Sequence, residues 1–88
     1  MTWKIELSKQ ANKQLSKLDK PVKQRLVDFL KNRVGKLENP RDLGKALQGD
    51  LSEYWVYRVG DYRLLTVIEN DKLVVVVVEV EHRKQVYK

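Results

Sequence analysis

The chain has 88 residues, the length of one domain, and its 42% hydrophobic and 34% charged residues are typical of a globular protein. The absence of cysteine excludes disulfides and thiolate metal sites. With one histidine, a metal site would need mostly carboxylate ligands, and the sequence has no suitable cluster of them. The longest apolar run, Leu73 to Val78, is too short to span a bilayer, and the first residues lack the apolar core of a secretory signal. We therefore expect a single domain over residues 1–88, located in the cytoplasm, without metal, cofactor or membrane partner.

The net charge of +6 is the first indication of function. A basic surface on a domain of this size suits a nucleic acid, a ribosome, an anionic membrane face or an acidic protein. The same charge also serves general solubility. Charge alone therefore selects no function.

The first third of the chain predicts a strand followed by a helix. Residues 2–7 alternate polar and apolar side chains, which is the period of a half-buried strand. Ser8 is then a suitable N-cap for a helix. The apolar positions of this helix are Ala11, Leu15 and Leu18. Asp19-Lys20-Pro21 is expected to end it and to begin a second helix, with Asp19 as N-cap and Pro21 in the first turn.

The second predicted helix has one apolar side and one basic side. Its apolar positions are Val22, Leu26, Phe29, Leu30, Val34 and Leu37. Its basic positions are Lys23, Arg25, Lys31 and Lys36. Ordinary solvated helix surface is the simplest explanation of the basic side. Asn39-Pro40 ends the helix, and we expect the two helices to form a hairpin that packs on a sheet.

The rest of the chain predicts a loop and then strands. The loop covers residues 41–51, with flexible points at Gly44 and Gly49, and the strands cover 53–59, 62–69 and 72–80. Two-residue turns are expected at Gly60-Asp61 and Asn70-Asp71. Five consecutive valines in the last strand indicate burial on both faces and hence an interior position. The order βααβββ predicts an α+β domain, an antiparallel sheet with an N-terminal strand and a helical hairpin packed on one face.

The turn at Gly60-Asp61 places Arg58 opposite Arg63 on the same face of the sheet. Like charges directly opposite one another destabilise a sheet, and an anion bound between or above them would explain the pair. Two side chains that diverge into solvent, or a different register, are the alternatives. Arg63 alone is the stronger candidate for a site.

Trp55 and Tyr57 lie on one side of the strand over residues 53–59. They belong either to the core or to a platform on which single-stranded RNA stacks. Core is the expected position of at least one of them.

The C-terminal segment from Glu81 to Lys88 concentrates reactive side chains directly after the buried strand. His82 lies between charged neighbours, so we do not expect it in the core, and an imidazole exchanges a proton near neutral pH. Arginine binds phosphate and tyrosine stacks on an exposed base, so Arg83 and Tyr87 suit an RNA site. A frayed basic tail is the alternative.

Three short motifs follow one another along the chain. They are Leu47-Gln48-Gly49, Tyr62-Arg63-Leu64 and His82-Arg83-Lys84-Gln85-Val86-Tyr87. Together with the element order, they resemble the RelE branch of the RelE/ParE toxin superfamily over nearly the whole chain. The resemblance implies a toxin that a separate RelB-like antitoxin wraps and blocks, with operator DNA bound only through the antitoxin complex. It also implies cleavage of mRNA in the ribosomal A site without metal or cofactor.

The resemblance carries over to individual residues. Arg63 matches the family's arginine on the middle strand, and Arg83 and Tyr87 match its C-terminal arginine and tyrosine. His82 stands where several relatives carry histidine. This chain also departs from the best-known pattern, because two lysines of that pattern fall at Trp55 and Tyr57 and the C-terminal helix of longer members is missing. The identity of the general base is left open.

These observations predict a division of labour for metal-free RNA cleavage. Arg63 and Arg83 are expected to stabilise the phosphate, and His82 is expected to transfer a proton. Tyr87 would stack on or orient the base, with proton transfer as a second role. The residues expected to hold the RNA backbone are Arg58, Lys84 and Lys88.

The predicted register limits this site. A turn at Asn70-Asp71 pairs Arg63 with Val78, and His82 then lies on the same face about 13 Å away. One phosphate cannot bridge that distance, so either the tail would have to curl back over the sheet or the complex with the ribosome would have to close the gap.

Two other functions share most of these features. A ParE-type gyrase poison has the same fold without a nuclease site, although its branch usually lacks the C-terminal constellation. A non-catalytic RNA-binding module would bind RNA and leave mRNA intact. A gyrase supercoiling assay and an mRNA cleavage assay separate these alternatives.

Overall fold

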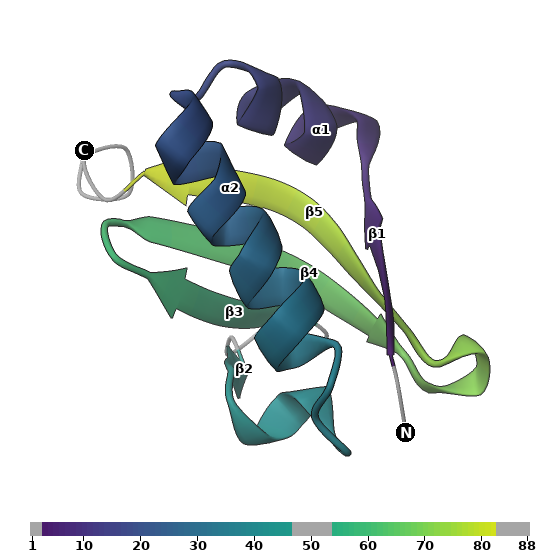
Figure 1. The fold of residues 1–88 in the computed structure, drawn as a ribbon. Helices are drawn as coiled ribbons and strands as arrows, with labels where there is room; N and C mark the ends of the chain where they lie inside the picture. Colours follow the sequence, from purple (N-terminus) through teal and green to yellow (C-terminus); the bar gives the residue numbers. More distant parts are fainter. Residues whose placement is uncertain (1–2, 47–53, 83–88) are drawn as a thin grey trace.

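The computed structural model describes residues 3–46 and 54–82 and has two layers, a five-stranded sheet and two helices that cover one of its faces (Figure 1). The strands are β1 (Lys4–Leu7), β2 (Lys45–Ala46), β3 (Tyr54–Val59), β4 (Tyr62–Glu69) and β5 (Val74–His82). The helices are α1 (Lys9–Ser16) and α2 (Lys20–Phe29), and α2 continues into a π-helical turn, Leu30–Val34. Short 3-10 turns cover Pro40–Asp42 and Asn70–Lys72.

The sheet order β1-β5-β4-β3-β2 confirms the α+β fold with a helical hairpin on one face. Two features refine the prediction. β1 pairs with β5 in parallel, so the sheet is mixed rather than wholly antiparallel. A two-residue strand, β2, pairs with β3 within the segment that was expected to be a loop. The interior position of the valine-rich strand is confirmed, because β5 lies between β1 and β4.

Local signals explain where the helices begin and end. The Ser8 hydroxyl accepts a hydrogen bond from the Ala11 amide at 3.0 Å, so Ser8 caps α1 as predicted. The Asp19 side chain makes no capping hydrogen bond, although α2 begins beside it with Pro21 in the first turn. The helical segment ends at Val34, before the predicted end at Asn39-Pro40, because the chain turns at Gly35 to meet the N-terminal strand. There the Gly35 carbonyl accepts a hydrogen bond from the Trp3 amide at 2.7 Å.

Helix α1 also completes the edge of β5 beyond the end of β1. The Ser8 hydroxyl donates to the Val78 carbonyl at 2.6 Å, and the Gln14 side-chain oxygen accepts from the Val80 amide at 2.7 Å. These side chains satisfy backbone groups that would otherwise face solvent at the end of a strand.

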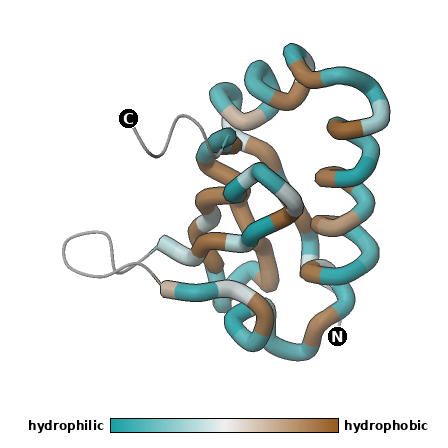
Figure 2. Tube along the Cα trace, turned by 90° about the vertical axis from the view of Figure 1, so that its left-hand side faces the viewer, coloured by the Kyte–Doolittle hydropathy of each residue, from teal (hydrophilic) through white to brown (hydrophobic). Residues whose placement is uncertain are grey.

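The hydrophobic core lies between the helices and the sheet, and hydrophobic residues concentrate along the strands in Figure 2. Its fully buried members are Ala11, Leu15, Leu26, Leu30, Val34, Tyr57, Leu64, Val75 and Val77. In the described ranges 3–46 and 54–82, no helix has the length and apolar character needed to cross a bilayer.

The two predicted hairpin turns have different outcomes. The Gly60-Asp61 turn is confirmed, because Gly60 has a φ of 59° and Val59 pairs with Tyr62. The turn at Asn70-Asp71 is wrong, because the connection runs through Leu73, which is left-handed with a φ of 53°, and Glu69 pairs with Val74.

A bulge between Leu65 and Thr66 shifts the register of β4 and β5 once more. As a result, Arg63 pairs with Glu81, not with Val78. The predicted register of these two strands is therefore wrong.

Candidate nucleic-acid interface

Two arginines and a carboxylate form a row on the face of the sheet that the helices leave uncovered. Arg58 pairs with Arg63, as the sequence predicted, and Arg63 pairs in turn with Glu81 on β5. Directly opposed residues have Cβ atoms about 5 Å apart, so the three side chains start close together. Tyr57 faces α2, and because side chains alternate along a strand, this row faces the other way.

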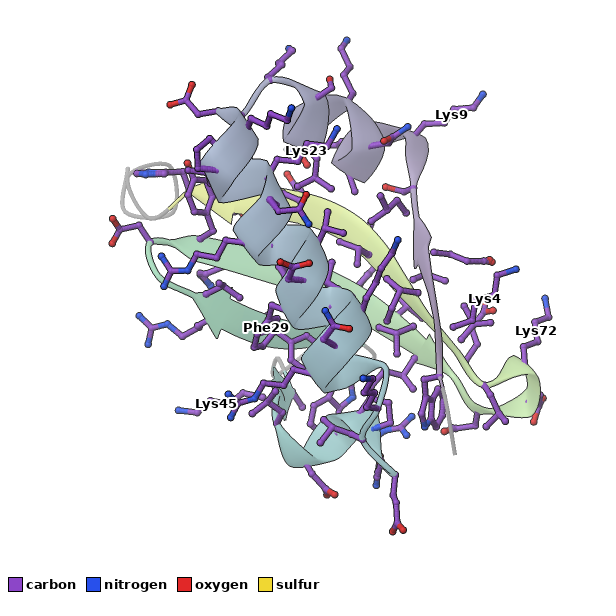
Figure 3. All side chains as sticks on the ribbon, viewed as in Figure 1. Lys4, Lys9, Lys23, Phe29, Lys45 and Lys72 are labelled. Carbon is purple, nitrogen blue, oxygen red and sulfur yellow. The ribbon has the colours of Figure 1, made fainter. Side chains whose placement is uncertain are left out.

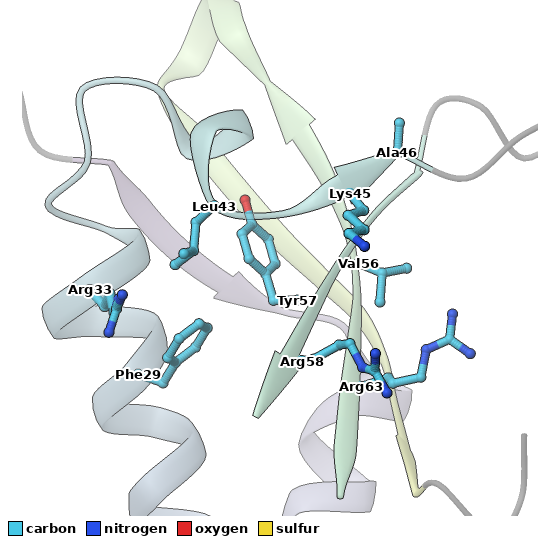
Figure 4. A pocket seen from close by; sticks show the side chains of 9 residues that line it. All are labelled: Phe29, Arg33, Leu43, Lys45, Ala46, Val56, Tyr57, Arg58 and Arg63. Atoms are coloured by element: carbon cyan, nitrogen blue, oxygen red, sulfur yellow. The ribbon is translucent and has the colours of Figure 1, made fainter. Parts of the chain in front are cut away.

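The arginines lie at one end of an open groove of about 590 Å³ that passes around the edge of β3 (Figure 4). The groove is lined by Phe29, Arg33, Leu43, Lys45, Ala46, Val56, Tyr57, Arg58 and Arg63. It therefore combines four cationic side chains with apolar walls, and its volume falls in the usual range of ligand sites.

Among the described residues, none of these four cations forms an ion pair. The ion pair found there joins Lys72 to Glu69 at 4.0 Å. Lysines also extend from many other parts of the surface (Figure 3). The groove differs from those positions because its cations converge on one concave site. Converging unpaired cations raise the local potential and attract an anion.

Tyr57 forms the floor of the groove and belongs to the core. Its side chain is 1% exposed, and its hydroxyl donates to the Pro40 carbonyl at 2.7 Å. Burial raises the pKa of Tyr57 to about 12, against the smaller opposing effect of the Arg41 charge. The ring has no free face for a nucleobase, so the RNA-stacking role considered for Tyr57 is wrong and the core alternative holds.

Trp55 is half-buried and packs against the core from the same side of β3. The Arg41 guanidinium lies 5.8 Å from the centre of the indole ring. A cation already occupies this ring face, and RNA binding by Trp55 stays a prediction.

His82 lies on the other face of the sheet from Arg63. It pairs with Tyr62, and the two rings meet edge to face with centroids 4.9 Å apart. The single site expected from Arg63 and His82 on one face is therefore wrong. The register shift explains the error, because it makes Glu81 the partner of Arg63 and turns its neighbour His82 to the helix side.

The remaining site candidates, Arg83, Lys84, Tyr87 and Lys88, lie outside the described residues, as does the Leu47-Gln48-Gly49 motif. Their roles stay predictions. Within the residues that the structure describes, no three side chains of the histidine, aspartate and glutamate types lie close enough to hold a metal ion.

Three residues of this region were missed from the sequence. Arg33 and Lys45 reach the groove from the π-helical turn and from β2, and neither element was predicted. Glu81 was passed over because the predicted register paired Arg63 with another residue. The structure explains the glycine before Lys45: a Cβ added at Gly44 would lie 3.0 Å from the Tyr57 ring, so this glycine permits a close approach of backbone to core.

A family model described as the ParE toxin of the type II toxin–antitoxin system parDE matches residues 5–87. The chain belongs to the RelE/ParE superfamily of type II toxins. Toxin RelG of Mycobacterium tuberculosis is 28% identical to this toxin over 88 residues, which cover 100% of this chain and 99% of RelG.

Solved structures agree with this assignment. A chain in the RelBE2 toxin–antitoxin complex of Mycobacterium tuberculosis is 28% identical with a TM-score of 0.86, covering 94% of this toxin and 93% of that chain. A chain in the intact Escherichia coli RelBE complex is 28% identical with a TM-score of 0.71, covering 91% and 95%. This toxin thus shares its fold with proteins solved in complex with RelB-type antitoxins.

Proposed function

We propose that this toxin is an endoribonuclease that cleaves mRNA on the ribosome and stops translation. The observation that carries the proposal is the groove, in which four unpaired cations surround a concave, partly apolar surface. Single-stranded RNA offers phosphates and unstacked bases, and such a surface complements both.

Arg63 and Arg58 bind the scissile phosphate in this proposal. The 2′-hydroxyl of the ribose attacks the adjacent phosphorus, the new oxygen–phosphorus bond closes a cyclic phosphate, and the bond to the 5′-oxygen breaks. Negative charge accumulates on the non-bridging oxygens during this step. Guanidinium groups placed there before the reaction stabilise that charge and lower the barrier.

Proton transfer falls to the end of β5. The 2′-hydroxyl must lose a proton and the departing 5′-oxygen must gain one. Glu81 lies directly across from Arg63 and is the candidate acceptor. His82 faces the helix side of the sheet, so the candidate donor is Tyr87, in its second role of proton transfer. Arg83 adds to phosphate stabilisation, and Tyr87 stacks on or orients the base.

The partners follow from the family. Relatives of this toxin are solved as complexes with RelB antitoxins. We propose that a RelB-like antitoxin binds this toxin and covers the groove, and that operator DNA is contacted only by the complex. Lys84, Lys88 and the indole of Trp55 add contacts to mRNA, and the site of action is the cytoplasm.

Primer extension on a reporter mRNA after brief induction tests this function. The native chain should create new 5′ ends within the translated region, and Arg63→Gln should reduce them about tenfold to a thousandfold. Lys23→Gln is a matched control. Lys23 is exposed on α2, away from the groove, and its substitution also removes one positive charge. Growth arrest with an intact message would refute the proposal.

A second function deserves a direct test because the matching family model is described as a ParE toxin. A ParE-type toxin that poisons gyrase would leave mRNA intact and inhibit DNA supercoiling by purified gyrase. We expect no inhibition of supercoiling by this toxin at concentrations that arrest translation.

A further inference from the structure

The groove extends well beyond the arginine pair. Its other end is formed by Phe29 and Arg33 on the helical side, next to Leu43, whereas Lys45 lies with the arginines on the far side of Tyr57 (Figure 4). One cleavable phosphate at Arg58 and Arg63 would leave this second end empty. An apolar surface beside the Arg33 guanidinium at that end suits a further part of the ligand.

The π-helical turn sets the shape of this end. In the turn over residues 30–34, the Gly35 amide donates to the Leu30 carbonyl at 2.8 Å, five residues back. Such a turn is wider than an α-helical one and often marks a functional site in a helix. Here it carries Arg33, which is exposed and lines the groove, while Leu30 and Val34 stay buried in the core.

The Phe29 ring packs against the core at the wall of the groove. It meets the Tyr57 ring edge to face, with centroids 6.3 Å apart and planes at 64°. Because Phe29 is only half-buried, part of its surface faces the groove, next to Leu43. Aromatic surfaces of this kind bind unstacked bases of single strands.

We infer that the Phe29–Arg33 end is a second nucleotide subsite, which binds a base and a phosphate of the RNA next to the cut. The base lies against Phe29 and Leu43, and the phosphate lies against the Arg33 guanidinium. The inference rests on the proposed function, and it adds the direction in which the RNA leaves the cleavage site. An acidic protein segment would use the charge of Arg33 but would gain little from the aromatic wall.

Oligonucleotide binding tests the subsite. The probes are a trinucleotide and a hexanucleotide of mixed sequence, 2′-O-methylated so that neither can be cleaved, and binding is followed by fluorescence anisotropy. We expect the native toxin to bind the hexanucleotide more tightly. Arg33→Gln should remove most of this advantage and lower the salt slope of hexanucleotide binding by about 0.7, while trinucleotide binding stays unchanged.

Phe29→Leu keeps an apolar side chain and removes the aromatic face. It should lower hexanucleotide affinity at least about fivefold, with an unfolding transition close to that of the native chain. Lys31→Gln is the matched control, because Lys31 is exposed on the same turn and lines a different groove beside β1.

Equal behaviour of Arg33→Gln and Lys31→Gln would overturn the subsite, and so would equal affinity of the native toxin for both probes. These outcomes leave the mRNA cleavage assay unaffected. Absent cleavage in cells with a retained length dependence would instead refute the nuclease and keep the subsite.

Discussion

The two faces of the sheet differ in how their polar groups are matched. On the helix-covered face, buried polar groups have hydrogen-bond partners. The Tyr57 hydroxyl donates to the Pro40 carbonyl, and the Thr66 hydroxyl donates to the Trp55 carbonyl at 2.8 Å. On the other face, Arg58 and Arg63 lie side by side, and no ion pair holds either among the described residues. We therefore propose that the helix-covered face supplies stability and that the open face, with the groove at its edge, binds the ligand.

This difference has a physical cause. A buried polar group without a partner costs about 1–3 kcal/mol, so a stable core must match each one. An exposed cation without an ion-pair partner costs little stability because water solvates it, so it is available to bind an anion. Substitutions on the two faces should therefore separate: those on the covered face should change stability, and those on the open face should change activity.

The largest expected effect is on the open face, at Glu81. If its carboxylate accepts the 2′-hydroxyl proton, Glu81→Gln should slow cleavage about a hundredfold or more without loss of fold. The measurement is the rate of message cleavage on programmed ribosomes, with His82→Gln assayed beside it. A normal rate in Glu81→Gln with a large loss in His82→Gln would return proton abstraction to the histidine.

Leu64→Ala tests whether a substitution on the helix-covered face changes stability without changing cleavage. Leu64 is fully buried between the helices and the sheet, so the cavity left by the alanine should lower the free energy of unfolding by about 2–5 kcal/mol. Urea denaturation measures this loss. Where the variant is still folded, its cleavage rate should stay within a few-fold of the native rate, and a selective loss of cleavage would break the division between the faces.

Tyr57→Phe should lower stability by about 1–3 kcal/mol at neutral pH, because the Pro40 carbonyl loses its donor. The difference in the free energy of unfolding between the native toxin and Tyr57→Phe should depend on pH. The folded pKa of about 12 is above the unfolded value of 10.0, so the phenol stabilises the fold fully below pH 10. That stability is lost between pH 10 and pH 12, and denaturation at several pH values should show the difference shrinking. A constant difference would contradict the buried, protonated phenol.

The smallest effect is expected at Leu73, the non-glycine residue with a positive φ in the described part of the chain. Leu73→Asn should change the free energy of unfolding by less than about 1 kcal/mol, because relief of left-handed strain offsets the loss of partial packing. Thermal unfolding measures it. A loss as large as that of Leu64→Ala would show that Leu73 belongs to the core in energetic terms.

The features predicted correctly from the sequence are those that depend on residues close together in the chain. The Ser8 cap, the apolar side of α2 and the Gly60-Asp61 turn depend on neighbours in the chain, and each is found. The Arg58–Arg63 pair followed from that turn. Leu73 carries no local signal for a left-handed residue, so the last hairpin and its register were predicted wrongly.

The groove escaped prediction for a related reason. Arg33 and Lys45 are brought near Arg58 by the packing of α2 and β2 around Tyr57, which links segments distant in the chain. Periodicity predicts that a helix has a buried side. It does not predict a π-helical turn or which basic residue that turn presents.

The most direct test of the central claim measures stability and cleavage on one preparation of Arg63→Gln. The free energy of unfolding comes from urea denaturation, and the cleavage rate comes from programmed ribosomes. We expect stability within about 0.5 kcal/mol of the native toxin, since Arg63 has no ion pair among the described residues, together with a cleavage rate at least about tenfold lower. A native cleavage rate, or a cleavage loss that only follows a loss of stability, would contradict the assignment of function to the open face.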